Sequence, residues 1–472
     1  MDQDIVRETP RDEGSLFYVA RVCFVATIGG LLFGFDTAVI SGTIPFITKY
    51  FSLSDAMLGW TVSSLLVGAV LGAGFAGTAS DRFGRKKVLL LCAVLLTISA
   101  VCAAIPRTLT GLILARFIGG LGVGAASMLS PMYIAEIAPA RIRGRLVSLN
   151  QLAIVIGILL AFFADYRLKD IPDGVLKFQV LSFPFELPSA NWRWMFGSQS
   201  LGAVLFFVFL FFVPESPRWL AKQKREAEAA AILTKVGGAD HAKAELSEIK
   251  EALGQEQDSL AMMLQPGMKL ALVIGIVLAV LQQVTGINVV MYYAPVIFAK
   301  AGSSVDSSLL QAVAVGVTNL IFTLVAVWGV DRFGRKVLLL AGSSGMGVFL
   351  ALLSGAFHYG KLEGPWVLLC VLGYVACFCV SLGPVVWVMI SEIFPNRVRG
   401  RAMSIATVCL WIACFLVSQT FPIMLKNLAG AATFGIYAMM CAVTFVFVFW
   451  MVPETKGKTL EEIEKHWLRL DT

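Results

Sequence analysis

Long runs of hydrophobic residues alternate with short polar segments along most of this chain. The hydrocarbon core of a bilayer takes about 20 residues of helix to cross, and twelve runs approach or exceed that length. They cover residues 18–42, 57–80, 88–106, 109–135, 147–165, 194–214, 269–299, 308–330, 337–358, 365–391, 402–425 and 431–452. The pattern therefore predicts an all-α membrane protein with 12 transmembrane helices.

Composition supports a lipid environment and excludes several other classes. Hydrophobic residues make up 58% of the chain and charged residues 15%, whereas soluble domains carry about 25% charged residues. A soluble globular fold, a disordered chain and a nucleic-acid-binding protein are therefore not expected. The chain has 9 Cys and 3 His without C-x-x-C spacing, so neither a metal site nor a disulfide scaffold is predicted.

The positions of the basic residues predict the orientation in the membrane. Roughly three quarters of the 38 Lys and Arg residues lie in the segments on one side of the predicted helices, and such residues concentrate on the cytoplasmic side. We therefore expect a multi-pass protein of the cell (inner) membrane with both termini cytoplasmic. The same bias explains the net charge of +7 without a nucleic-acid partner.

Three motifs occur twice, in the same order and at nearly the same offset. Each pair falls at the cytoplasmic ends of equivalent predicted helices, as expected for two parallel six-helix halves. The pairs are residues 81–86 and 331–336, 136–145 and 392–401, and 214–216 and 453–455.

The repeat divides the chain into five predicted parts. They are a cytoplasmic tail (1–17), a six-helix bundle (18–214), a helical cytoplasmic linker (215–268), a second bundle (269–452) and a C-terminal helix or tail (453–472). The outer segment 166–193 mixes Pro, aromatic and charged residues, and its structure is not predicted by the pattern.

Acids recur beside the repeated cations. Glu136, Glu215, Glu392 and Glu454 lie near basic residues at the cytoplasmic ends, so ion pairs there could open and close an inner gate. The alternative is that the cations only anchor the orientation of the chain.

Two charged residues fall inside predicted helices, where a charge costs about 2.5–3.5 kcal/mol on insertion scales. Asp36 is the one carboxylate placed deep in a span, and Arg116 lies early in the fourth span. A carboxylate beside a mobile cation can take up and release a proton, which suits proton coupling. A static ion pair is the alternative.

The seventh hydrophobic run carries neutral amides, namely Gln282, Gln283 and Asn288, together with residues that let a helix bend. Amides bind hydroxyl groups, and aromatic rings cover the C–H faces of a sugar. Singly, such residues are more often helix–helix contacts. Further residues that could complete a polyhydroxyl pocket are Gln151, Asn319, Trp387 and Trp411.

Other chemistry is not supported. Residues 72–77 fit G-x-G-x-x-G but lie inside a hydrophobic run without a preceding strand, so a dinucleotide site is not expected; close packing of small residues explains them better. ATP-binding and catalytic motifs are absent from the sequence. We therefore expect neither an enzyme nor a cofactor.

The combined motifs resemble those of the sugar porters of the major facilitator superfamily, over nearly the full chain. They are closest to the bacterial sugar–proton symporters of pentoses and hexoses. The motifs are G-x-x-x-D-R-x-G-R-K at 77–86, P-E-S-P-R at 214–218, Q-Q-x-x-G-I-N at 282–288 and P-E-T-K-G at 453–457.

The resemblance implies a major facilitator fold and a role for each matching residue. Sugar-binding positions match Gln151, Gln282, Gln283, Asn288 and Trp387, and pocket-lining positions match Phe33, Tyr293, Asn319, Phe378, Gly383 and Trp411. Asp36 matches the proton-accepting residue and Arg116 its partner. The inner-gate network matches Arg85, Glu136, Arg143, Glu215, Arg335, Glu392, Arg399 and Glu454.

Departures from the family pattern leave the sugar undecided. Leu410, Cys414 and Ile158 stand where polar residues occur in the family, and Gln199 replaces a membrane glutamate. We expect a carrier of a monosaccharide and a proton that functions as a monomer. A passive sugar uniporter and an inositol or polyol carrier are the alternatives, while a sugar sensor or an intramembrane enzyme lacks sequence support.

Overall fold

The computed structural model describes residues 15–172, 174–180, 183–254, 266–362, 364–394 and 399–456. Within these residues, 12 helical segments are long and apolar enough to cross a membrane. The prediction of a twelve-helix membrane protein is therefore confirmed.

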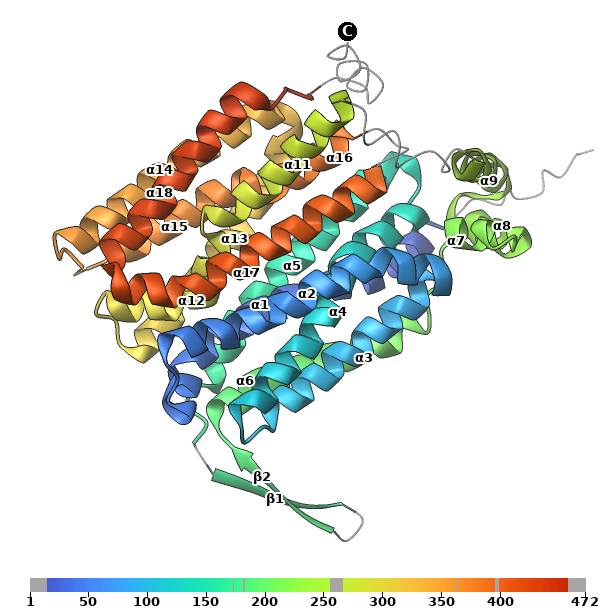
Figure 1. The fold of residues 1–472 in the computed structure, drawn as a ribbon. Helices are drawn as coiled ribbons and strands as arrows, with labels where there is room; N and C mark the ends of the chain where they lie inside the picture. The colour runs from blue at the N-terminus through green and yellow to red at the C-terminus, as the bar shows by residue number, and fades with distance from the viewer. Residues whose placement is uncertain are drawn as a thin grey trace, which may run out of the picture.

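The first six membrane helices pack as one bundle, with α1 against α4 and α5, α2 against α4, and α3 against α6. Figure 1 shows them in blue to green, beside the helices of the second half. Their bounds are α1 (Leu16–Phe51), α2 (Asp55–Phe83), α3 (Arg85–Ala104), α4 (Leu109–Ile137), α5 (Ala140–Leu168) and α6 (Asn191–Leu210).

The second bundle contains two spans that are each divided into two helices, α11 with α12 and α15 with α16. The two bundles meet mainly where α2 packs on α17 and α5 packs on α13. The bounds are α11 (Pro266–Val284), α12 (Ile287–Lys300), α13 (Val305–Phe333), α14 (Arg335–His358), α15 (Trp366–Val380), α16 (Leu382–Ile393), α17 (Arg399–Asn427) and α18 (Ala429–Met451).

Opposite ends of the molecule carry different additions (Figure 1). The short helices α7 (Pro217–Lys222), α8 (Glu226–Gly237) and α9 (Ala239–Gly254) lie at the end we call the linker face. The antiparallel strands β1 (Gly174–Val180) and β2 (Phe183–Ser189) pair at the opposite end, the hairpin face. Among the residues that the structure describes, these two strands are the only β-structure, and they lie in the segment whose structure the pattern does not predict.

Small residues bring the helices of the first bundle into backbone contact. A methyl group added at Gly120 or Gly124 of α4 would overlap a carbonyl oxygen of α2. In the G-x-G-x-x-G segment, the same holds at Gly72 against α4, whereas Gly74 and Gly77 have open space around them. Close packing therefore explains one of the three glycines in that segment.

Candidate functional site

Three neutral amides form a one-way hydrogen-bond chain at the break between α11 and α12. Asn288 Nδ2 donates to Gln283 Oε1 over 2.6 Å, and Gln283 Nε2 donates to Gln282 Oε1 over 3.2 Å. Gln282 Nε2 then donates to the carbonyl oxygens of Leu382 and Gly383, over 2.7 and 3.2 Å. This amide relay (Asn288, Gln283 and Gln282) links the break in one span to the break in the other.

The relay forms where two membrane spans are interrupted, one between α11 and α12 and the other between α15 and α16. Gly286 has φ +95°, a conformation that glycine adopts without steric cost, and α12 begins directly after it. The carbonyl oxygen of Thr285, exposed by this break, accepts a hydrogen bond from the Tyr374 hydroxyl over 3.0 Å. In the other span, Ser381 is non-helical between α15 and α16.

Aromatic rings from both bundles meet near the relay. Phe33 of α1 and Trp411 of α17 lie edge to face with ring centroids 5.5 Å apart. Trp411 is buried, and its Nε1 donor has no partner. Buried indole N–H groups normally find an acceptor, whereas this donor is unsatisfied in the conformation described.

The remaining predicted pocket residues differ in their contacts. Gln151, Trp387 and Phe378 are partly exposed. Asn319 is buried, and its Oδ1 accepts from Thr323 and Cys379 rather than joining the relay. The Tyr293 hydroxyl donates to the Ser418 carbonyl over 2.9 Å.

Cys414, a departure from the family pattern in the sequence, is a neighbour of the relay. Its Sγ accepts a hydrogen bond from Asn288 Nδ2 over 3.1 Å. The thiol therefore fixes the same amide that donates to Gln283, and it makes this side of the relay less polar than a second amide would.

Asp36 and Arg116 lie together in the first bundle, both almost fully buried. The nearest approach is 4.0 Å, between Arg116 Nη1 and Asp36 Oδ1. Arg116 is held more closely by α2, where Thr61 and Val62 accept its hydrogen bonds through their carbonyl oxygens, over 3.1 and 3.3 Å. Asp36 Oδ2 has no hydrogen-bond partner, so the carboxyl group has an oxygen free to take up a proton.

The burial of a second carboxyl group is not predicted by the sequence pattern. Asp36 is the one carboxylate expected deep in a span, and Asp165, three residues before the end of α5, is buried as well, with 1% of its surface exposed. Asp165 ends a hydrophobic run, a position that the sequence pattern does not distinguish from a solvated helix end.

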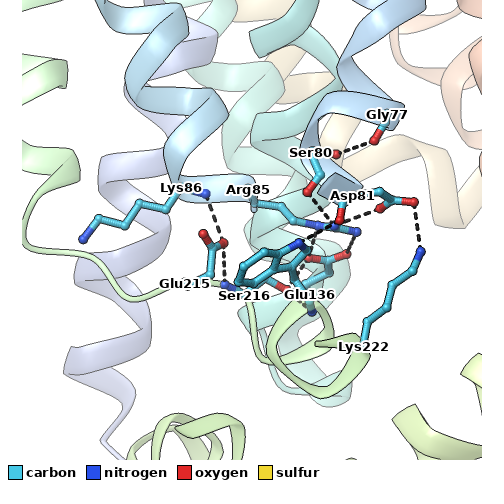
Figure 2. Close-up of polar contacts among 10 residues, drawn as sticks. Gly77, Ser80, Asp81, Arg85, Lys86, Glu136, Glu215, Ser216 and Lys222 are labelled. Carbon is cyan, nitrogen blue, oxygen red and sulfur yellow. Dashed lines mark hydrogen bonds and ion pairs between the residues drawn. The ribbon is translucent and has the colours of Figure 1, made fainter. Parts of the chain in front are cut away.

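At the linker face, the first copy of the repeated motifs forms a compact ion network (Figure 2). Arg85 binds Glu136 through two hydrogen bonds, of 3.1 and 3.0 Å, and it binds Asp81 at 2.9 Å. The Ser216 hydroxyl also donates to Glu136. Each of these residues belongs to the first half of the chain.

The position of the Glu215 side chain explains why residue 84 of this motif is glycine. Its carboxylate accepts hydrogen bonds from the backbone N–H groups of Lys86 and Ser216, over 3.1 and 2.9 Å. Gly84 lies directly beneath it with φ +98°, and any side chain there would overlap that carboxylate. The acid caps the start of α3, where unpaired N–H groups favour negative charge.

The second copy repeats this geometry. Arg335 binds Glu392 at 3.0 Å, and the Thr455 hydroxyl donates to the same glutamate. Glu454 accepts from the backbone N–H groups of Arg335 and Lys336, each over 3.0 Å. Burial opposes ionisation of Glu454, but backbone hydrogen bonds outweigh it and hold the pKa of this carboxyl below its usual range.

One predicted gate residue makes other contacts in the structure. Arg143 donates to Glu245 of α9 over 3.1 Å and to the Ala138 carbonyl over 3.2 Å, so it fastens the linker helices to the first bundle. Arg399 lies outside the residues whose side chains are described. The ion pairs described at this face lie within one half each.

Polar contacts between the halves, among the described residues, lie toward the hairpin face. Lys426 pairs with Asp55 at 2.8 Å, and Lys169 pairs with Asp306 at 3.0 Å. The Gln419 side chain accepts a hydrogen bond from the Ser63 hydroxyl over 2.7 Å. It donates one to the carbonyl oxygen of Ala56 over 3.2 Å. This hairpin-face latch closes that side of the molecule in the conformation described.

Comparison with known proteins identifies the family. The model of the family described as "Sugar (and other) transporter" matches residues 22–467. The chain belongs to this sugar transporter family.

Individual members of the sugar transporter family are similar over almost their whole length. The arabinose-proton symporter of Bacillus subtilis is 44% identical over 456 residues, covering 96% of each chain. The D-xylose-proton symporter of Escherichia coli is 43% identical over 482 residues, covering 95% of this chain and 96% of that protein.

A solved structure supports the fold. The major facilitator superfamily proton:xylose symporter XylE, bound to 6-bromo-6-deoxy-D-glucose, matches with a TM-score of 0.80 at 42% identity, covering 96% of this chain and 99% of that chain. The expected major facilitator fold with two six-helix halves is confirmed.

In this sugar transporter, Arg85→Ala is expected to lower stability more than Arg335→Ala. The Glu136 side chain is 9% exposed and Glu392 is 23% exposed, and removing one partner of a buried pair costs about 3–5 kcal/mol. Thermal unfolding of the detergent-solubilised variants measures the difference. Equal midpoints for the two variants would contradict this ranking.

Lys426→Asp is expected to weaken the hairpin-face latch by placing two acids opposite each other. An exposed pair is worth about 0.2–1 kcal/mol, so the open-to-closed ratio at this face should rise by up to about fivefold. Fluorescence energy transfer between labels at the hairpin-face ends of α2 and α17 measures the ratio. The charge swap Asp55→Lys/Lys426→Asp should restore it, and failure to restore it would show that the pair does not act as a latch.

Proposed function

We propose that this protein carries a monosaccharide and a proton together across the inner membrane by alternating access. The observation that carries the proposal is the buried pair of Asp36 and Arg116, 4.0 Å apart with one carboxylate oxygen unpartnered. It lies in a chain whose similar relatives include symporters of arabinose and of D-xylose.

The amide relay is the proposed sugar site. Its three side chains offer donors and acceptors without net charge, as a polyhydroxyl ligand requires, and the unpartnered Trp411 Nε1 adds a donor. The remaining proposed contacts are Gln151, Asn319, Trp387, Phe33, Tyr293, Phe378 and Gly383.

Proton coupling is assigned to Asp36. When its carboxylate takes up a proton, its attraction to Arg116 is lost, and Arg116 retains the α2 carbonyl oxygens as partners. The helices α1 and α4 can then move relative to each other. Release of the proton on the other side restores the ion pair and resets the carrier.

Orientation follows from the basic residues. The linker face, with the repeated Arg and Lys motifs, is assigned to the cytoplasm together with both termini, because cytoplasmic segments are enriched in these residues. The conformation described is then closed toward the outside by the hairpin-face latch. Each half supplies residues to the site, so one chain is sufficient for transport.

Reconstitution in proteoliposomes tests the proposal. D-xylose, L-arabinose, D-glucose, D-galactose and myo-inositol are added in turn while the external pH is recorded. Alkalinisation driven by one or more monosaccharides is expected. If sugar equilibrates without a proton signal, the protein is a passive uniporter, and a signal with myo-inositol alone would identify a polyol carrier.

A further inference from the structure

A second buried carboxyl group lies outside the proposed sugar and proton sites. Asp165 of α5 is 1% exposed and packs directly against Gly42 of α1. Its Oδ2 accepts a hydrogen bond from the Gly42 backbone N–H over 3.1 Å, across 123 positions of sequence. Its Oδ1 has no partner.

No described cation compensates this group. The structure shows no ion pair between Asp165 and any described residue, although α5 packs against α1, α4, α6 and α13. On its own helix, the nearest cation, Arg167, is exposed, and Lys169, directly after the helix, binds Asp170 and Asp306 instead. In the hairpin-face parts of the packed elements, the charged or titratable groups are Lys49 and Tyr50 on α1, Arg116 on α4, Arg193 on α6 and Asp306 on α13, with Asp36 further along α1. The groups toward the opposite ends of these elements include Tyr18, Arg21 and Cys23 on α1, Tyr133 and Glu136 on α4, and Arg332 on α13.

The surroundings on α1 suit a protonated acid better than a carboxylate. Pro45 has no N–H, so the carbonyl oxygen of Ser41 lacks its helical donor. The Ser41 hydroxyl also has no partner. A carboxylate can only accept hydrogen bonds, whereas a protonated carboxyl group also donates one. Burying an unpaired carboxylate is costly, and such a group takes up a proton instead.

Asp165 is placed to respond to opening of the hairpin face. It lies three residues before the end of α5 at that face, and it follows Leu159 and Phe162, which pack against Gly316 of α13 in the other half. When the halves separate at the hairpin face, this contact opens and water can approach. Asp165 lies near the hairpin-face end of its helix, whereas Asp36 lies further into the bundle on α1. Asp165 therefore exchanges protons with the hairpin-face side alone.

We propose that Asp165 is a second proton-binding site, protonated when the hairpin face is closed and able to ionise when that face opens. It binds and releases its proton on the same side, so it sets the pH dependence of closure without adding to the number of protons transported. The inference rests on the proposed sugar–proton symport, in which Asp36 carries the transported proton.

Sugar exchange in an Asp36→Asn background isolates this site. Asp165 must be neutral for closure, so exchange by Asp36→Asn is expected to fall as the pH rises. We expect a fall of about tenfold, which corresponds to a change of about 1.4 kcal/mol in the balance between the two conformations. In Asp36→Asn/Asp165→Asn the rate should stay at the acidic value, because asparagine resembles the neutral acid. Asp36→Asn/Asp170→Asn, with an exposed acid at the same helix end changed, is the matched control and should keep the fall.

Infrared spectroscopy gives a readout that does not depend on transport. Asp36→Asn should show the carbonyl stretching band of a protonated carboxylic acid at neutral pH, and the band should disappear in Asp36→Asn/Asp165→Asn or in Asp36→Asn/Asp165→Ser. An unchanged band, or a pH profile of exchange that is the same with and without Asp165, overturns the inference. Absence of sugar-driven proton uptake in the wild type would instead overturn the proposed function. The pH profile of exchange and the infrared band do not measure that uptake, so the two failures can be told apart.

Discussion

Asp36→Asn is expected to abolish sugar-driven proton uptake while sugar exchange continues. Asparagine cannot ionise, and Arg116 keeps its two carbonyl partners on α2, so the bundle should still fold. One proton moving down 100 mV supplies about 2.3 kcal/mol, enough for roughly a fifty-fold sugar gradient. In proteoliposomes with an imposed proton gradient, the ratio of internal to external sugar should therefore fall from about fifty in the wild type to about one in the variant.

Counterflow of labelled sugar shows whether the variant still binds and translocates. Asp240→Asn, which changes an exposed acid at the start of α9, is the control and should accumulate sugar as the wild type does. Proton uptake that persists in Asp36→Asn would show that another group carries the transported proton. Loss of both exchange and uptake would assign Asp36 a structural role.

The membrane-spanning pattern could be predicted because the bilayer imposes a length and polarity on each helix. The repeated motifs could be predicted to be equivalent, and Glu215 and Glu454 indeed occupy matching positions at the starts of α3 and α14. Gly286 and its neighbours predicted a bend, and the structure divides that span there.

Contacts made by tertiary packing could not be predicted in this way. Arg143 binds Glu245 because α9 docks beside it, and hydrophobic patterning carries no information on where a polar linker docks. The burial of Asp165 depends on the close approach of Gly42. An aspartate at the end of a hydrophobic run does not indicate such a contact. The face that is closed is a property of the conformation, and one sequence encodes both conformations.

Gln282→Ala is expected to weaken sugar binding by about tenfold to a hundredfold. The side chain donates to two carbonyl oxygens at the start of α16 and accepts from Gln283. Leaving buried partners unsatisfied costs about 1–3 kcal/mol, or about fivefold to 150-fold in an equilibrium constant, which brackets the expected loss of affinity. The loss should appear in the dissociation constant, measured by isothermal calorimetry on the detergent-solubilised protein with the sugar that the wild type transports.

The direction of the relay makes the test sharper. Gln282→Glu keeps the size of the side chain but turns the donor into a carboxylate oxygen that faces two carbonyl oxygens, so it should bind sugar no better than Gln282→Ala. Gln311→Ala is the control, because the side-chain hydrogen bonds that Gln311 makes with described residues are to Ser303 and Ser307, near the hairpin face. Wild-type affinity in Gln282→Ala would exclude the relay as the sugar site, whereas equal losses in Gln282→Ala and Gln311→Ala would indicate a general loss of structure. A loss confined to Gln282 would show that sugar is held where the two broken spans meet, so that binding and the rearrangement of those spans share the same hydrogen bonds.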